Sequence, residues 1–327
     1  MRSLRIILAA LGALLAPAIA HAQDQATVVS SCGSITIKAG TQHFRTIDLT
    51  GQTCNSGGAA TGACSEATSY LARTAGGNEG GNAAPITALI CGLVADGLWS
   101  KFDALYLPAQ QNEADARLNL VSTSFTLPAS SATFVPYQGY SHFTAGTNTG
   151  FIPGTTAGRK FQDNNGSLGV WAYDTPDFGL QMGASTNTGG SAIAAAYSGG
   201  AQYYCYIAYA TPPYATPPGL PGFYSCDKAD ATNVGVYFNG ALLVTQAQGT
   251  SASPGESMYV GSAAYLAATQ KTVSEVNFGS SLGGTPGQLA LNNRLHTYMM
   301  AVGWTGAVLK PGPKPPDQVT PHVEPKP

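Results

Sequence analysis

Apolar and polar residues alternate in short stretches over most of the chain, which is the pattern of half-buried β-strands. Two such stretches flank Asn239 and Gly240, and an Asn-Gly pair between apolar stretches is the strongest short hairpin signal. We expect a hairpin there, formed by residues 234–238 and 241–245, and a smaller one formed by residues 34–38 and 44–49. Further strands are expected over residues 167–173, 178–182, 202–209 and 273–278.

Two stretches repeat apolar residues every three or four positions and predict helices. The first covers residues 85–107, begins with a proline that suits a first turn, and ends before Pro108. The second covers residues 287–301 and ends at Gly303. Residues 53–84 are expected to form a loop.

The first residues of the chain predict a cleaved signal peptide. Arg2 and Arg5 precede an apolar stretch of about ten residues, and Ala20 and Ala22 fit a cleavage site. We assign residues 1–22 to this signal. The stretch is too short to span a bilayer, and no later segment has the roughly 18 apolar residues that a membrane span needs. The mature chain is expected to be periplasmic, at the cell surface or secreted.

Composition favours an extracellular β-protein and excludes one class of partner. Charged residues make up 10% of the chain and the formal net charge is −2, whereas about 25% charged residues is usual. Nucleic-acid-binding proteins carry basic patches or a high pI, so no nucleic-acid partner is expected. Residues 306–327 are rich in proline and lysine and are expected to form a disordered tail.

The cysteines predict disulfides, because an exported protein meets an oxidising compartment. The chain has six cysteines and no Cys-x-x-Cys pair, which removes the usual zinc and thioredoxin interpretations. We favour a disulfide between Cys205 and Cys226, which flank a proline-rich run, then one between Cys32 and Cys54. Elimination leaves the pair formed by the remaining two cysteines, Cys64 and Cys91. Fifteen pairings exist for six cysteines, so the sequence does not fix the pairing, and buried free thiols are the alternative.

One sequence motif matches the nucleophile elbow of hydrolases, Gly-x-Ser-x-Gly, over residues 279–283. The elbow needs a helix that starts at the serine, and here two glycines and Pro286 intervene. The required acidic residue between Ser281 and His296 is also absent from the sequence. We therefore expect a plain turn.

A second motif begins like the carboxylate strand of jelly-roll glucanases, with Glu113 and Asp115. Leu118 stands where the next carboxylate is needed, and the segment is better described as a helical turn. With no complete catalytic motif, we expect no catalytic residues and predict that the protein is not an enzyme.

Two oxygen-rich turns offer ligands for a calcium ion, through Asp163 in one and through Asp174 and Asp177 in the other. Asp and Asn are equally common in turns for backbone reasons, which is the competing interpretation. The histidines are scattered, so no histidine cluster is visible. We expect no other cofactor.

Tyrosines around the proline-rich run are the best candidates for ligand binding, because tyrosine offers a flat apolar face and a hydroxyl that suit sugars and protein surfaces. Strand alternation places Tyr204 and Tyr206 on one face and Tyr203 on the other. The alternative is that one face is core and the other covers a sheet. The predicted ligand-binding residues are Tyr204, Tyr206, Tyr209, Tyr214 and Tyr224.

The later strands resemble those of concanavalin A-like (laminin-G-like) jelly rolls. The chain has Tyr-Phe-Asn-Gly over residues 237–240, then a strand ending at Gly261, then Val-Ser-Glu-Val-Asn-Phe over residues 273–278. Residues 92–99 and 294–298, together with 28–33, look like a group of such domains in phage tail and prophage-type surface proteins of proteobacteria. The signal peptide departs from phage structural proteins and favours a bacterial secreted protein.

The resemblance implies a mainly β fold, a concanavalin A-like jelly-roll sandwich with two flanking helices and a small disulfide-bearing N-terminal β module. We assign that module to residues 23–64 and the jelly roll to residues 65–305. The implied function is non-catalytic recognition of a glycan or cell-surface component, lectin-like or tail-fibre-like. A structural component of a surface or phage-derived particle is one alternative, and a polysaccharide-active enzyme of glucanase-like fold is another. The oligomeric state stays open.

Overall fold

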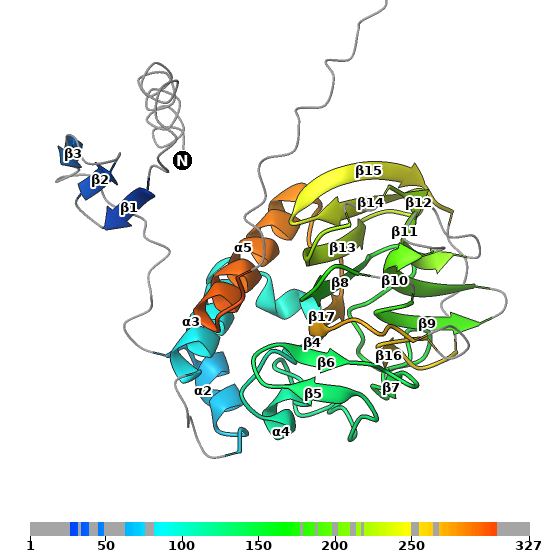
Figure 1. Ribbon diagram of the computed structural model, residues 1–327. Coiled ribbons are helices and arrows are strands. Elements are labelled where there is room, and N and C mark those ends of the chain that lie inside the picture. Colours follow the sequence, from blue (N-terminus) through cyan, green and yellow to red (C-terminus); the bar gives the residue numbers. More distant parts are fainter. Residues whose placement is uncertain are drawn as a thin grey trace, which may run out of the picture. The chain divides into compact units, whose positions relative to one another are not determined.

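The computed structural model (Figure 1) forms two compact units, Met1–Ala59 and Ala60–Pro327. The structure describes residues 27–31, 34–38, 45–48, 63–75, 82–176, 179–186, 189–197, 202–209, 214–216, 219–249, 255–263 and 268–305. The predicted signal peptide and the predicted C-terminal tail lie outside these residues. No helix within the described ranges is long and apolar enough to cross a membrane.

The first unit contains a small antiparallel sheet of strands β1 (Thr27–Ser31), β2 (Ser34–Lys38) and β3 (Arg45–Asp48). Residues Ser34 to Ile37 of β2 pair with Asp48 to Arg45 of β3, which confirms the predicted hairpin. Cys32 and Cys54 lie outside the described residues, so their disulfide stays a prediction.

The second unit is a jelly-roll sandwich of two antiparallel sheets (Figure 1), so the mainly β prediction is confirmed. The order of the eight-stranded sheet is β15-β14-β13-β8-β17-β6-β5, and β4 pairs with β17. Its strands are β4 (Phe102–Tyr106), β5 (Thr133–Val135), β6 (Gly139–Ser141), β8 (Gly166–Ala172), β13 (Gly222–Lys228), β14 (Asn233–Phe238), β15 (Ala241–Ala247) and β17 (Val273–Gly279).

The six-stranded sheet has the order β12-β11-β10-β9-β16-β7. Its strands are β7 (Thr147–Asn148), β9 (Met182–Thr186), β10 (Gly189–Tyr197), β11 (Gln202–Tyr209), β12 (Tyr214–Ala215) and β16 (Tyr259–Val260). The predicted strand over residues 178–182 begins in residues that are not described, and β9 starts at its last residue.

The central strands β8, β13 and β17 of the eight-stranded sheet are buried on both faces, because helices cover the face that does not meet the other sheet. Along β8, Leu168 and Val170 point into the core between the sheets, whereas Trp171 belongs to a second core under the helices. These helices are α2 (Ser65–Leu71), α3 (Ala83–Ala95) and α5 (Thr285–Ala301). The prediction of a helix over residues 287–301 is therefore confirmed.

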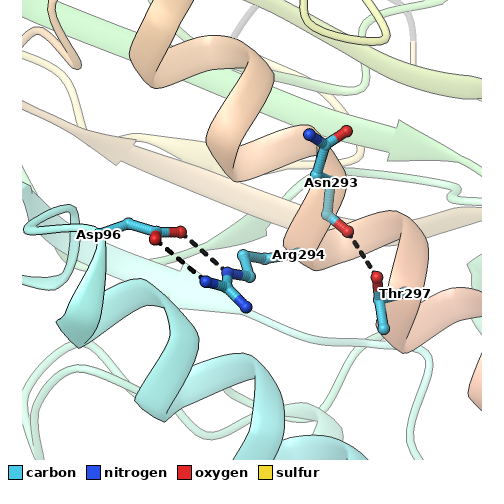
Figure 2. A network of polar contacts seen from close by, with 4 residues as sticks. All are labelled: Asp96, Asn293, Arg294 and Thr297. Carbon is cyan, nitrogen blue, oxygen red and sulfur yellow. Dashed lines mark hydrogen bonds and ion pairs between the residues drawn. The ribbon is translucent and has the colours of Figure 1, made fainter. Parts of the chain in front are cut away.

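Helices α3 and α5 contact each other along the sheet (Figure 1). Arg294 of α5 makes a two-pronged ion pair with Asp96, which follows α3, with Nε and Nη2 at 2.8 and 3.0 Å from the carboxylate oxygens. Figure 2 shows this pair and the neighbouring bond in which the Thr297 hydroxyl donates to the Asn293 carbonyl. Both partners of the ion pair are partly exposed, so the pair adds little stability.

The predicted helix over residues 85–107 is wrong in its second half. Helix α3 ends at Ala95 because Gly97 adopts a positive φ of 71°. A short 3₁₀ turn, η1 (Trp99–Lys101), follows, and then β4 pairs with β17. The apolar residues of β4 fit the spacing of a helix as well as that of a strand, and pairing with β17 makes this segment a strand. The loop predicted over residues 53–84 is also wrong in part, since it contains α2.

Local signals elsewhere agree with the structure. Asn239 and Gly240 both have positive φ, 48° and 76°, as the expected hairpin turn requires. The predicted helical turn is α4 (Glu113–Ala116). Two disulfides are formed, Cys64–Cys91, which elimination left as a pair, and Cys205–Cys226, which the sequence favoured. The second joins β11 of one sheet to β13 of the other.

Candidate functional site

The tyrosines of β11 alternate between the two faces of the six-stranded sheet. Tyr203 lies in the core between the sheets, and its hydroxyl donates to the Ser225 carbonyl at 2.9 Å. Tyr204 and Tyr206 lie together on the opposite face, in a cluster with small residues such as Ala192 and with Leu180. The predicted alternation is confirmed. However, Tyr204 and Tyr206 are only 9% and 6% exposed, so neither offers an open ring face to a ligand.

Tyr224, another of the predicted ligand contacts, is fully buried and presents no open ring face in this structure. Its side chain points into the core, where its ring meets that of Tyr203 edge to face at 5.2 Å. Its hydroxyl donates to the Leu220 carbonyl at 2.7 Å, and burial raises its pKa. Strand β13 places even-numbered residues inward here, which the sequence did not reveal. The side chains of Tyr209 and Tyr214 lie outside the described residues, so their role stays a prediction.

A groove of about 340 Å³ lies between α2, the start of η1 and the segment after α4. We call it the α2 groove. Its volume falls in the range of small-molecule sites, about 300 to 1,000 Å³. The residues that line it are Ser65, Glu66, Ser69, Tyr70, Arg73, Trp99, Leu120, Val121, Ser122 and Thr123.

One face of α2 supplies a wall of the groove through Glu66, Ser69 and Tyr70, which recur at helical spacing. Arg73, in the turn that follows α2, continues this wall. Tyr70 is fully buried and anchors the helix in the core under it. The disulfide between Cys64 and Cys91 ties the start of α2 to α3. Tyr70 therefore holds this wall against the core, and the disulfide holds the N-terminal end of α2.

Arg73 fixes the opposite wall. Its Nη1 donates to the Ser122 carbonyl at 2.6 Å, and its Nη2 donates to the carbonyls of Asn119 and Leu120, both at 2.9 Å. The guanidinium also lies 5.3 Å from the centre of the Tyr70 ring. Burial lowers the pKa of Arg73, but guanidinium groups stay charged in proteins. The main role of Arg73 is thus to hold residues 119–122 in place.

The groove joins an apolar plane to polar groups. Trp99 is half-buried and packs its inner side against the core under the helices. Around it lie the Glu66 carboxylate, which accepts a bond from the Ser65 hydroxyl at 3.0 Å, and further serine and threonine hydroxyls. An aromatic face with hydroxyl and carboxylate groups beside it can stack on a sugar ring and hydrogen-bond its hydroxyls. Sequence reasoning missed this site.

Asp115 of the glucanase-like motif makes hydrogen bonds that join parts of the fold. Asp115 is buried, and its carboxylate accepts bonds from the Ala75 N–H and from the Asn112 side chain, both at 2.8 Å. The Asn112 side chain in turn caps α4 by accepting from the Asp115 N–H. Asp115 thus connects α4 to the end of α2.

The serine motif at residues 279–283 forms a turn held by a buried carboxylate. Ser281 donates its hydroxyl to Asp227 at 2.9 Å, and the N–H groups of Leu282 and Gly284 donate to the same carboxylate at 2.8 and 2.7 Å. Burial raises the pKa of Asp227, and the three donors oppose that shift. His296 lies elsewhere, with its ring 6.2 Å from that of Trp171.

Another carboxyl is buried where β17 faces the helices. Glu275 accepts a bond from the Asn277 side chain at 2.6 Å, and burial raises its pKa well above the ordinary value. Its second oxygen and the Trp171 indole N–H find no hydrogen-bond partner among the described residues. Burial of this kind disfavours the charged form of the carboxyl.

The aspartates predicted to offer calcium ligands that the structure describes, Asp163 and Asp174, each have neighbours within the protein. Asp174 accepts bonds from the Thr272 N–H and hydroxyl at 3.2 and 3.1 Å, whereas Asp163 lies near Lys228. Asp177 lies outside the described residues. Within the described part of the chain, no three His, Cys, Asp or Glu side chains form a group that could hold a metal ion.

No family model matches the chain, and no curated protein matches it. Solved structures with similar folds include domain 4 of an extracellular arabinanase from Geobacillus stearothermophilus in complex with arabinotriose. That match has 12% identity and a TM-score of 0.38, and covers 59% of this chain and 98% of the other.

The binding domain of botulinum neurotoxin serotype D matches with 7% identity and a TM-score of 0.42, covering 60% of this chain and 52% of the other. A mutant Trypanosoma rangeli sialidase matches with 13% identity and a TM-score of 0.43, covering 65% of this chain and 39% of the other. These likenesses assign the chain to none of their families.

Proposed function

We propose that this protein is an exported, non-catalytic glycan-binding protein that holds its saccharide in the α2 groove. The observation that carries the proposal is the half-buried Trp99 in a groove of about 340 Å³, flanked by hydroxyls and the Glu66 carboxylate. A sugar ring has an apolar face and a hydroxyl rim, and this groove offers a partner for each.

The rigidity of the groove supports binding. Arg73 fixes one wall by three carbonyl bonds, and Tyr70 anchors the other. A preformed site loses less conformational freedom when its ligand binds, which raises affinity. The alternative site, around Tyr204 and Tyr206, would first have to expose rings that are now buried.

Export is part of the proposal. The two disulfides among the described residues are compatible with an extracellular or periplasmic protein. The signal peptide predicted over residues 1–22 would direct the chain to export and then be cleaved. A saccharide of a cell surface or of an extracellular matrix is therefore the ligand class that we expect.

The test is a panel of oligosaccharides and polysaccharides, with binding to the purified disulfide-bonded protein measured by calorimetry and reducing ends measured in the same samples. We expect binding without release of reducing ends. Trp99→Ala should weaken binding at least about tenfold, or about 1.4 kcal/mol, because it removes the stacking plane. Trp99→Phe should retain part of the affinity.

Tyr204→Ala is the control, because it alters the other candidate site. Unchanged affinity in Trp99→Ala, with a loss in Tyr204→Ala, would move the site to the six-stranded sheet. Release of reducing ends would show an enzyme and contradict the non-catalytic proposal. Thermal unfolding of each variant checks that a change in affinity is not a loss of folded protein.

A further inference from the structure

Two of the residues that line the α2 groove carry a charge, and the positive one, Arg73, has no carboxylate partner. Its guanidinium contacts three backbone carbonyls, which are neutral, and the ring of Tyr70. The ion pair that the described residues form joins Arg294 to Asp96 instead. The groove therefore contains a cation that no acidic side chain of the described residues balances.

The guanidinium of Arg73 keeps donors that the protein does not use. It has five N–H groups, of which Nη1 uses one and Nη2 uses two to bond the carbonyls of residues 119–122. One N–H on Nη1 and the N–H on Nε remain. The Nε atoms of Arg117 and Arg159 are shut off from solvent without a partner, whereas the Nε atom of Arg73 is not. A ligand in the groove can therefore accept hydrogen bonds from Arg73.

Burial makes the charge of Arg73 costly. The side chain is partly buried, and burial lowers the pKa of its guanidinium, because a charge is less stable away from water. A negative group placed beside it would offset that cost. Hydrogen bonds from a guanidinium to a carboxylate are also roughly twice as strong as those between neutral groups. At this position the groove is thus better suited to an acidic ligand group than to one more hydroxyl.

The negative charge of the groove, Glu66, lies at the other end of α2. Glu66 is in the first turn of the helix and Arg73 follows its last turn. Their residue numbers differ by seven, which corresponds to about 10 Å along the helix. The two side chains form no ion pair with each other. At physiological salt the Debye length is about 8 Å, so much of the repulsion between Glu66 and an acid group at Arg73 is screened.

From these observations we propose that the α2 groove selects saccharides that carry a carboxylate, and that Arg73 binds this carboxylate. The proposal rests on the glycan binding proposed above and names the class of glycan. Uronic acids and sialic acids share the required chemistry, which is a carboxylate on a ring that can stack on Trp99. Ligand binding by Arg73 adds to its three bonds to the groove wall.

The test compares acidic saccharides with neutral counterparts by calorimetry, on the full disulfide-bonded protein. Oligogalacturonate is paired with its methyl ester, and sialyllactose with lactose, so the two pairs also separate uronic from sialic acids. We expect at least one acid to bind about tenfold more tightly than its counterpart. This preference should fall between about 20 mM and about 500 mM NaCl, because salt screens the contact, while the affinity for the neutral saccharide stays unchanged.

Arg73→Gln removes the charge and keeps an amide donor for the groove wall. We expect the ratio of acid to neutral affinity to fall to about 1, and Arg73→Lys, which keeps the charge, to retain part of the preference. Glu66→Gln should raise the ratio about twofold, because it removes the repulsion. Lys271→Gln removes a positive charge outside the groove and should leave the ratio unchanged. A ratio measured within one variant cancels a general loss of affinity from a loosened wall.

Equal affinities for the acidic and neutral forms, or binding of neutral saccharides alone, would overturn the inference and leave the proposed glycan binding intact. A preference that persists in Arg73→Gln, or that Lys271→Gln abolishes, would place the carboxylate elsewhere and also contradict it. No binding of any saccharide would overturn the proposed function and this inference together. If thermal unfolding shows that Arg73→Gln is not folded, Glu66→Gln decides, because an unchanged ratio in that variant would argue against a carboxylate in the groove.

Discussion

Glu275 places an acidic side chain within the layer between β17 and the helices. One carboxyl oxygen has the Asn277 amide as its donor, and the other has no partner among the described residues. Ionising such a group in an apolar layer is costly, so the folded protein holds this proton to a higher pH than the unfolded chain does. The folded state thereby binds a proton that the unfolded chain releases at an ordinary glutamate pKa of about 4.3.

The contribution of Glu275 to stability should therefore fall as the pH rises. The contribution of Glu275 is complete below the unfolded pKa and is lost as the pH increases toward the raised folded pKa. Glu275→Gln keeps an oxygen for Asn277 and removes the titration. We expect this variant to gain stability relative to the unaltered protein between pH 4 and pH 8, by about 1.4 kcal/mol for each unit of pKa difference crossed.

Urea unfolding at pH 4, 6 and 8 measures this effect. Glu256→Gln, which removes the same charge from a partly exposed position, is the control for net charge. If the stabilities of the Glu275→Gln variant and the unaltered protein ran parallel over this pH range, Glu275 would not titrate abnormally.

For single residues, the sequence predicted which side chains share a face of a strand, but not how deeply those side chains are buried. Alternation alone separates Tyr203 from Tyr204 and Tyr206, because each strand residue reverses the side-chain direction. It does not say which face meets the other sheet, so the burial of Tyr224 was missed. Alternation also does not indicate that neighbouring residues cover Tyr204 and Tyr206 on the outer face.

Among the elements, the turn before α5 depends on a carboxylate from another strand. Asp227 of β13 accepts from the Ser281 hydroxyl and from the N–H groups of Leu282 and Gly284. Gly284 has a positive φ of 73° and directly precedes the first residue of α5. Asp227 thus satisfies donors that the glycine-rich turn leaves without partners of its own.

Asp227→Asn should destabilise the fold by about 2–4 kcal/mol, because an amide N–H₂ would face two donors in a buried site. Thermal or urea unfolding measures the loss. Asp96→Asn is the comparison, since it breaks only the partly exposed ion pair with Arg294 and should cost under about 1 kcal/mol. Equal losses in the two variants would argue against the buried network as the source.

Local chemistry explains which elements could be predicted. The Asn239-Gly240 turn needs positive φ at both residues. Asn and Gly are the residue types that adopt positive φ most readily, so the sequence predicts this turn directly. The stretch 102–106 could not be separated from α3 by periodicity, because its apolar residues suit a buried strand as well as a helix. Helix α2 has only seven residues, and it is held by its disulfide and by Tyr70 rather than by a strong helical pattern.

In the whole molecule, the α2 groove is a product of tertiary structure. Its walls come from residues 65–73, from Trp99 and from residues 120–123, which only the packed fold brings together. No spacing in the sequence links these segments. The mainly β sandwich, in contrast, follows from many short alternating stretches, each carrying its own signal.

The disulfide between β11 and β13 also sets how the molecule would respond to a pulling force. A chain stretched from its two ends cannot extend the 21-residue separation between Cys205 and Cys226, nor the 27-residue separation between Cys64 and Cys91. Under reducing conditions, single-molecule stretching should therefore reveal roughly 70 Å and roughly 90 Å of additional chain length. Equal extension with and without reductant would mean that neither bond lies in the force path. With both bonds intact, a protein under mechanical load would keep part of its sandwich linked by covalent bonds even after the strands had separated.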